Sequence, residues 1–263
     1  IGTGGRDLSS EVGGIMMLEG VKALQADPTT KVLLLVSKPP SPEVAEEVLQ
    51  QLSESDKPAV VCFLGGKRKP VNKQLKKQAQ TLKDGLGAQQ RYFRGLFSGG
   101  TFCYETQLIL AKMLDGETVV SNAPVDKANR MADSNVSQGH TVVDLGEDEF
   151  TVGRLHPMLD PTLRNRRIIQ EARDPETAVI YLDVVLGYGV HPDPAGAAVE
   201  AIREAQQILN EEGRQVIFVA HVCGTAGDPQ NAPAQEQILQ EAGVVVLPTN
   251  AAATRLAGYI LKA

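Results

Sequence analysis

Small residues between an apolar segment and a helix-like segment form the part of the sequence best suited to binding an anion. Residues 95–98 predict a strand, Ser98-Gly99-Gly100-Thr101 follow, and residues 104–114 predict a helix. Glycines let the backbone approach a ligand closely, and the free N–H groups and dipole of a helix N-terminus favour phosphate or carboxylate. Ser98 and Thr101 can add hydroxyl donors. The pattern equally fits a tight turn in which Ser98 or Thr101 caps the helix, so both interpretations stay open.

A second glycine cluster lies at the start of the sequence. It contains Gly4, Gly5 and Arg6, which pair a flexible loop with a guanidinium fork. Such a fork can bind a phosphate or carboxylate in a bidentate manner. The alternative is a surface ion pair of Arg6 with Asp7 or Glu11.

A third cluster, at residues 144–157, contains Gly153, Arg154 and His156. We predict Arg154 and His156 as catalytic residues, because polar side chains in loops more often serve function than packing. The acidic residues of this cluster could suggest Mg²⁺, but solvated loops commonly carry such residues, and we predict no metal site. Neither a Walker-type phosphate loop nor a Gly-x-Ser-x-Gly motif occurs.

Composition narrows the class of protein. The 263 residues suffice for two domains, and the formal charge of −6 argues against a nucleic-acid partner. No apolar run is long enough to span a membrane, so we expect no membrane association. Three widely spaced cysteines indicate a reducing compartment, and we expect a cytoplasmic location. Because the sequence begins with Ile1 and a glycine cluster, we expect it to be cut from a longer protein.

Short β-branched segments alternate with helical segments, which is typical of βαβ units and parallel sheets. The predicted strands are residues 32–36, 59–64, 95–98, 141–145, 179–185, 216–220 and 244–247. Asp27-Pro28 and Asp174-Pro175 each enter an apolar strand within the same order of elements, which indicates an internal repeat. We therefore predict an α/β protein of two similar doubly wound units, residues 1–90 and 91–263, with the N-terminal strand of the first unit missing. The basic segment of residues 65–83 could suggest a phosphate partner. We interpret it as a solvated helix and interdomain connector, because aromatic residues are absent and the whole chain is acidic.

Several motifs together resemble the FdrA family of acyl-CoA-synthetase-like proteins. They are residues 4–9, 11–14, 36–40, 98–101, 150–154, 156–158, 160–165, 182–187, 223–225 and 227–230, which cover nearly the whole chain. The resemblance implies flavodoxin-like ligase units related to succinyl-CoA synthetases, in which paired helix N-termini hold a phosphohistidine. It also adds Gly187, Gly224 and Thr225 to the predicted phosphate-binding residues.

The chain departs from that family pattern at the phosphohistidine. Residues 65–90 contain no histidine, so the Gly-His-Ala-Gly phosphoacceptor is missing. The CoA-binding domain of the family is also not part of this sequence. We therefore expect no tightly bound cofactor; phosphate, a nucleotide or CoA could bind through absent segments. The partners implied are a small anion, a second copy of the chain in a homodimer, and other FdrA-operon-type subunits.

The leading hypothesis is an enzyme subunit that handles an acyl or carbamoyl phosphate at facing glycine loops without a phosphohistidine. The resemblance also implies a subunit of an oxamate carbamoyltransferase in allantoin breakdown. A non-catalytic scaffold subunit is the rival, because the phosphoacceptor is missing. A flavin or nucleotide binder rests on fold analogy alone.

Overall fold

The computed structural model describes residues 1–4, 6–55, 57–64 and 73–262. The chain divides into two compact units, Ile1–Pro70 and Val71–Ala263. The expected boundary between residues 90 and 91 therefore differs from the observed one. The reason is helix α3, Lys73–Lys83, whose buried Leu75 and Ala79 share a core cluster with Leu256 and Ala257 of α9. This helix belongs to the core of the second unit, where a connector was expected.

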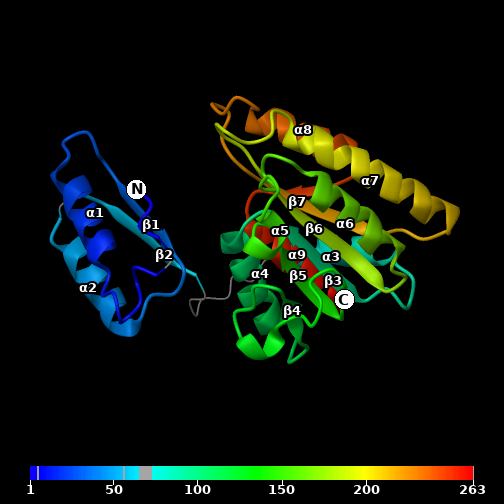
Figure 1. The fold of residues 1–263 in the computed structure, drawn as a ribbon, viewed down its shortest axis with the longest axis horizontal. Helices are drawn as coiled ribbons and strands as arrows, with labels where there is room; N and C mark the ends of the chain where they lie inside the picture. Colours follow the sequence, from blue (N-terminus) through cyan, green and yellow to red (C-terminus); the bar gives the residue numbers. More distant parts are fainter. Residues whose placement is uncertain (5, 56, 65–72, 263) are drawn as a thin grey trace. The chain divides into compact units, whose positions relative to one another are not determined.

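The first unit consists of α1 Ile15–Ala26, β1 Leu33–Ser37, α2 Pro42–Ser53 and β2 Ala59–Phe63. The two strands pair in parallel, with Leu33 opposite Ala59. Both helices cover the same face of this small sheet (Figure 1), where Leu33 and Leu35 are buried. The opposite face carries exposed Leu34 and Val36. The described part of this unit is thus smaller than the expected doubly wound unit.

The predicted repeat is visible in the order and geometry of the elements. Asp27 ends α1 before β1, and Asp174 ends α6, Thr162–Arg173, before β6, Thr177–Val185. Their dihedral angles are nearly equal, with φ −72° and ψ 117° at Asp27 and φ −70° and ψ 117° at Asp174. A helix and a second parallel strand follow in both places. The first unit therefore repeats one helix–strand–helix–strand segment of the second.

The second unit is built on a parallel sheet of six strands in the order β4-β5-β3-β6-β7-β8. Its further elements are β3 Tyr92–Phe97, α4 Gly100–Met113, β4 Val119–Ser121, η1 Lys127–Asn129, β5 His140–Asp144, α5 Asp148–Thr151, α7 Pro194–Glu211, β7 Ile217–Cys223, α8 Ala232–Glu241, β8 Val245–Leu247 and α9 Asn250–Lys262. Without the edge strand β4, the chain order reads 2-1-3-4-5, which is the flavodoxin-like order. This confirms the predicted α/β class with parallel sheets.

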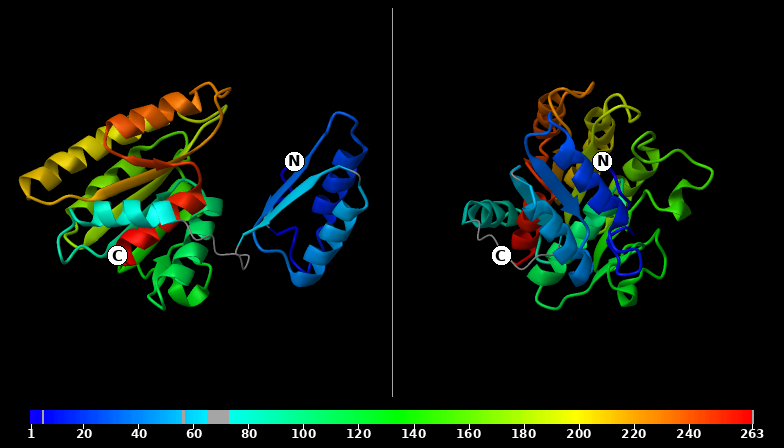
Figure 2. Two further views of the ribbon diagram at one scale, coloured as in Figure 1. Left: turned by 180° about the vertical axis from the view of Figure 1, so that it is seen from behind. Right: turned by 90° about the vertical axis from the view of Figure 1, so that its left-hand side faces the viewer.

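Helices cover both faces of the six-stranded sheet (Figures 1 and 2). Helices α6, α7 and α8 pack on one face, and α3, α4 and α9 pack on the other. The central strand β6 is buried along nearly its whole length because it has neighbours on both sides and helices on both faces. In the described part of the chain, no helix has the length and apolar character needed to cross a bilayer.

Candidate functional site

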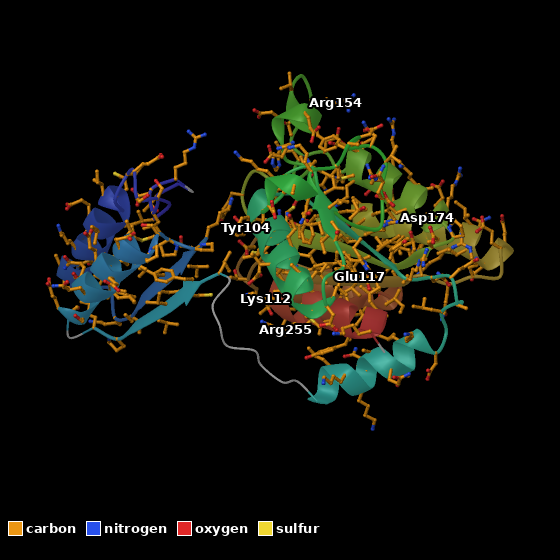
Figure 3. The ribbon with its side chains drawn as sticks, turned by 90° about the horizontal axis from the view of Figure 1, so that it is seen from below. Tyr104, Lys112, Glu117, Arg154, Asp174 and Arg255 are labelled. Carbon is orange, nitrogen blue, oxygen red and sulfur yellow. The ribbon has the colours of Figure 1, made fainter. Side chains whose placement is uncertain are left out.

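The carboxyl edge of the six-stranded sheet brings several of the predicted loops together. In the sheet register, Phe97 at the end of β3 lies opposite Asp144 at the end of β5, and Leu96 lies opposite Leu182 of β6. The chain reverses its direction of winding between β3 and β6, and in such sheets ligands bind in the crevice at this switch point. Figure 3 shows Tyr104 of α4 toward this edge and Asp174 toward the opposite one. The loop of residues 98–101 therefore stands where a ligand is expected.

Helix α4 begins at this switch point without a side-chain cap. Gly99 is its N-cap residue, with an extended backbone at φ −168° and ψ 154°, and as a glycine it supplies no side-chain cap. The first N–H groups of a helix have no partner within the helix, so those of Gly100 and Thr101 face outward from the helix end. A Cβ atom on Gly100 would lie 3.0 Å from Asp144 Oδ2, which limits this position to a small residue. The geometry is that of an anion-binding helix terminus.

Ser98 has a different role from the predicted one. Its N–H and its hydroxyl donate to the two carboxylate oxygens of Asp183, at 2.9 and 2.8 Å. Asp183 is fully buried in β6, and Arg164 Nη1 donates to its backbone oxygen at 2.7 Å. Burial raises the pKa of Asp183, while Arg164 and the hydrogen bonds from Ser98 oppose that rise. Ser98 therefore connects the end of β3 to β6, and both of its hydrogen-bond donors already have acceptors within the protein.

His156 lies beside the same loop. A Cβ atom on Gly146, just after β5, would be 2.9 Å from His156 Nε2 and 2.9 Å from the Ser98 backbone oxygen. His156 Nδ1 accepts a hydrogen bond from the Met158 N–H at 3.3 Å, so the neutral ring carries its proton on Nε2. The half-buried imidazole thus presents an N–H donor next to the β3 and β5 loops. Only a glycine at position 146 leaves room for this approach.

Arg154 lines a cavity beside α5 and α6. It is exposed on the loop that follows α5, where Gly153 adopts a positive φ of 75° (Figure 3). The cavity also borders Leu155 and Pro157, the two residues that flank His156. Arg154 and His156, predicted together, therefore lie on the same loop but have different surroundings.

Contacts within the protein account for the other predicted phosphate-binding residues, Gly187, Gly224 and Thr225. The Gly187 N–H donates to the Gln230 side chain at 3.1 Å. A Cβ atom on Gly224 would lie 2.7 Å from the Leu186 side chain, so close packing requires glycine there. The N–H and hydroxyl of Thr225 both donate to Asp228 Oδ2, at 2.6 and 3.0 Å. As with Ser98, the donors of Thr225 are engaged within the protein.

The first glycine cluster belongs to the other unit. Gly4 has a positive φ of 82°, Arg6 is exposed, and Gly5 lies outside the described residues. The buried Asp7 accepts hydrogen bonds from the N–H groups of Met16 and Met17, at 2.9 and 2.8 Å, and so satisfies the start of α1. A binding role for Gly4, Gly5 and Arg6 stays a prediction.

The acidic residues of the third cluster form hydrogen bonds within the protein. Glu149 accepts from Asn122 Nδ2 at 2.8 Å and from the Ser134 hydroxyl. Asp144 accepts from the Gly146 N–H at 2.9 Å. In the ranges that the structure describes, no group of three or more His, Cys, Asp or Glu side chains is arranged to hold a metal ion.

A buried polar chain near α4 and α9 was not predicted. The Tyr181 hydroxyl donates to Asn250 Oδ1 at 2.5 Å, so His221 Nδ1 donates to the hydroxyl at 2.8 Å. Asn250 Nδ2 donates to Glu105 Oε2 at 2.7 Å, which connects α9 to α4. The His221 ring also meets the Phe102 ring edge-on, at 4.5 Å between centroids. This chain of hydrogen bonds orients the first turn of α4 against the sheet.

An uncapped helix N-terminus at the switch point of a flavodoxin-like sheet is typical of α/β proteins that bind phosphate-containing ligands. Residues 96–260 match the CoA-ligase family, and the chain belongs to that family. It is 43% identical over 277 residues to the uncharacterised protein YahF of Escherichia coli (strain K12), with 94% of this chain and 53% of that protein covered. The chain thus spans about half the length of this curated relative.

Two solved structures also resemble the chain. One is ATP citrate lyase from Methanosaeta concilii in complex with (3S)-citryl-CoA, with 12% identity and a TM-score of 0.38. The other is ATP citrate lyase from Methanothrix soehngenii in complex with citrate and coenzyme A, with 12% identity and a TM-score of 0.37. Each comparison covers 97% of this chain and 37% of the other. Similarity at this level carries no conclusion about the site.

Proposed function

We propose that the second unit binds the phosphate of an acyl or carbamoyl phosphate at the N-terminus of α4 and takes part in acyl transfer, as an FdrA-type member of the CoA-ligase family. The observation that carries this proposal is the uncapped start of α4 at the switch point, with His156 Nε2 beside the same loop. Membership of the CoA-ligase family supports acyl chemistry of this kind.

The chemistry assigned to the loop is stabilisation of the leaving phosphate. When a nucleophile attacks the acyl carbon, the bond from that carbon to the phosphate oxygen breaks, and phosphate leaves with the electron pair. The N–H groups of Gly100 and Thr101 would hold the phosphate oxygens, and His156 Nε2–H would donate a further hydrogen bond. No phosphohistidine is required in this scheme. The alternative assignment as a subunit of an oxamate carbamoyltransferase uses the same step with carbamoyl phosphate.

A non-catalytic scaffold subunit is the second candidate. The donors of Ser98 and Thr225 are already engaged by Asp183 and Asp228, which favours this candidate.

A cytoplasmic location, a homodimer and FdrA-type partner subunits also remain part of the proposal. YahF extends beyond the part that this chain matches, and we propose that in either candidate a corresponding segment supplies further groups.

Calorimetric titration with phosphate, acetyl phosphate and carbamoyl phosphate tests the proposal. Gly100→Pro removes one N–H donor, and the extended Gly99 suits a following proline at the first helical position. Its Cβ atom meets the same 3.0 Å contact with Asp144 Oδ2 as that of an alanine. Gly100→Ala adds a Cβ atom but keeps the N–H, so it is the matched control. Loss of one hydrogen bond to a charged phosphate is worth about 1.5–3 kcal/mol, or a weakening of about 10- to 100-fold in Gly100→Pro relative to Gly100→Ala. Equal binding by both variants, or no binding by the wild-type chain, would favour the scaffold.

A further inference from the structure

The side-chain amide of Asn250 lies at the centre of a buried hydrogen-bond network that joins α9, β6 and α4. Asn250 is the first residue of α9 and is 3% exposed. Its Oδ1 atom accepts hydrogen bonds from the Tyr181 hydroxyl at 2.5 Å and from the Thr106 hydroxyl at 3.2 Å. Its Nδ2 atom donates to the Phe102 backbone oxygen at 3.3 Å and to Glu105 Oε2 at 2.7 Å. The amide therefore uses both of its N–H groups and both lone pairs of its oxygen.

The partners of Asn250 fix the orientation of its amide. A backbone oxygen and an ionised carboxylate only accept hydrogen bonds, so the amide nitrogen must face Phe102 and Glu105. On the other side, the Thr106 hydroxyl donates to the amide oxygen and lies 3.0 Å from the Thr254 hydroxyl, which donates to it in turn. A side chain of this shape with donors on one side and an acceptor on the other is an asparagine. The position therefore tolerates neither an apolar residue nor a carboxylate without loss of hydrogen bonds.

The network holds the first turns of α4, directly after the candidate phosphate donors. Gly99 and Gly100 precede this part of the helix, and glycine allows the backbone more conformations than any other residue. Phe102 follows Thr101, so the hydrogen bond from Asn250 to the Phe102 oxygen restrains the turn that carries the N–H groups of Gly100 and Thr101. Donors that are restrained before the ligand arrives lose less conformational entropy on binding.

Asn250 is itself held by rigid elements. The Thr249 hydroxyl accepts a hydrogen bond from the Ala252 N–H at 3.1 Å, which satisfies a donor at the start of α9. Further along this helix, Leu256 and Ala257 are fully buried in the core cluster that α9 shares with α4. The Tyr181 ring is fully buried in the central strand β6. Side chains that are supported in this way can fix the geometry of a neighbouring binding site.

We propose that Asn250 is a positioning residue for the candidate phosphate site. By holding the first turn of α4, it pre-orients the N–H groups of Gly100 and Thr101 and raises their affinity for phosphate. This inference rests on the proposed function for the identity of the ligand. It adds α9 to the elements that determine phosphate affinity, through α4 and without an assigned contact to the ligand.

Asn250→Asp tests the inference, because it keeps the shape of the side chain and replaces the amide nitrogen with a second carboxylate oxygen. That oxygen faces two acceptors, the Phe102 oxygen and the Glu105 carboxylate, and repels both. Binding of acetyl phosphate, measured by calorimetry, should weaken about 10-fold. Addition of Glu105→Gln to Asn250→Asp places an amide N–H opposite the new carboxylate and restores the hydrogen bond with donor and acceptor exchanged. The double variant should bind within about 3-fold of the wild type.

Glu105→Gln alone separates positioning from a direct effect of charge. Asn250 Nδ2 can still donate to the oxygen of the new amide, so affinity should stay within about 3-fold of the wild type. A purely electrostatic effect would instead strengthen phosphate binding by the same factor by which Asn250→Asp weakens it. Ile202→Val is the control for lost stability, because Ile202 is buried in α7 on the opposite face of the sheet. It should bind acetyl phosphate as the wild type does.

Amide chemical shifts of the unliganded chain distinguish this inference from the proposed phosphate site. Asn250→Asp should move the amide signals of Gly100 and Thr101 without any ligand, Glu105→Gln added to it should reverse the change, and Ile202→Val should leave them in place. These changes together with no phosphate binding by the wild type would retain Asn250 as the residue that positions α4 and remove the proposed function. Unchanged amide signals or unchanged affinity in Asn250→Asp, equal and opposite effects of the two single variants, or no recovery in the double variant would overturn the inference.

Discussion

Acidification from pH 6.5 to pH 4 is expected to destabilise the second unit through His221. This residue is only 3% exposed, and burial lowers its pKa from 6.5 to about 4. In the unfolded chain the same imidazole is solvated and takes up a proton near its ordinary pKa of about 6.5. Between pH 6.5 and pH 4, His221 is therefore protonated in the unfolded chain but not in the folded unit. The free energy of unfolding therefore falls as the pH falls.

The structural reason is the tautomer that the buried polar chain requires. His221 Nδ1 donates to the Tyr181 hydroxyl, so Nε2 is the unprotonated nitrogen of the ring. Nε2 is buried without a hydrogen-bond partner in the described part of the protein. Protonation would place a charged N–H group in this apolar surrounding next to Phe102, with no acceptor to stabilise it.

The size of the His221 contribution to the free energy of unfolding follows from the difference between its pKa values in the unfolded and folded states. A pKa that moves from 6.5 to about 4 corresponds to roughly 3 kcal/mol at about 1.4 kcal/mol per unit. This contribution is complete above pH 6.5 and is lost by about pH 4, below which both states carry the proton. Asp183 acts in the opposite sense, because its raised pKa favours the folded state as the pH falls. A single pH profile therefore cannot isolate His221.

Urea denaturation at pH 7, 6, 5 and 4, followed by circular dichroism, provides the assay. His221→Asn keeps an N–H donor toward the Tyr181 hydroxyl but does not titrate, so subtracting its free energy of unfolding cancels the other ionisable groups. The free energy of unfolding of the wild type minus that of the variant should fall by about 3 kcal/mol between pH 7 and pH 4. A difference that stays constant with pH would refute the argument.

Two further predictions concern packing at the carboxyl edge. Asp183→Ala leaves the buried Arg164 guanidinium without its counter-charge and is expected to lower the free energy of unfolding by about 3–5 kcal/mol, measured by urea denaturation. A loss below about 1 kcal/mol would contradict the pairing of Asp183 with Arg164. Gly224→Ala forces a Cβ atom to 2.7 Å from Leu186 and should lower the free energy of unfolding by about 1–3 kcal/mol. Gly227→Ala, with its nearest contact at 3.7 Å, should lower it less, and equal losses in both variants would argue against close packing at Gly224.

Local elements of both units could be predicted because each has its own sequence pattern. The strand, glycine turn and helix around residues 95–114 match β3 and α4, and Pro42–Ser53 forms the helix that its apolar spacing predicts. The short edge strand β4, Val119–Ser121, was missed, because three residues carry too little periodicity. The packing of α3 was also missed, because a solvated connector helix was expected where Leu75 and Ala79 pack in the core.

The site was harder to predict because its contacts join distant residues. The hydrogen bonds that connect Tyr181 with His221 and Asn250 span 40 and 69 residues along the chain. Only the sheet order brings these residues together, and no local pattern encodes it. One signal was present: Asp183 interrupts an apolar strand, and a charged residue in a strand buried on both faces requires a partner. That partner, Arg164, lies on the helix that precedes the strand.

Amide chemical shifts of the second unit test the central claim most directly. Titration of the ¹⁵N-labelled chain with acetyl phosphate should move the Gly100 and Thr101 amide protons downfield in a saturable manner, because these N–H groups would donate to the phosphate oxygens. The amide of Ser98, already engaged by Asp183, should move less. Saturable shifts confined to other loops, or no shift at Gly100 and Thr101, would contradict the assignment of the α4 N-terminus as the phosphate site.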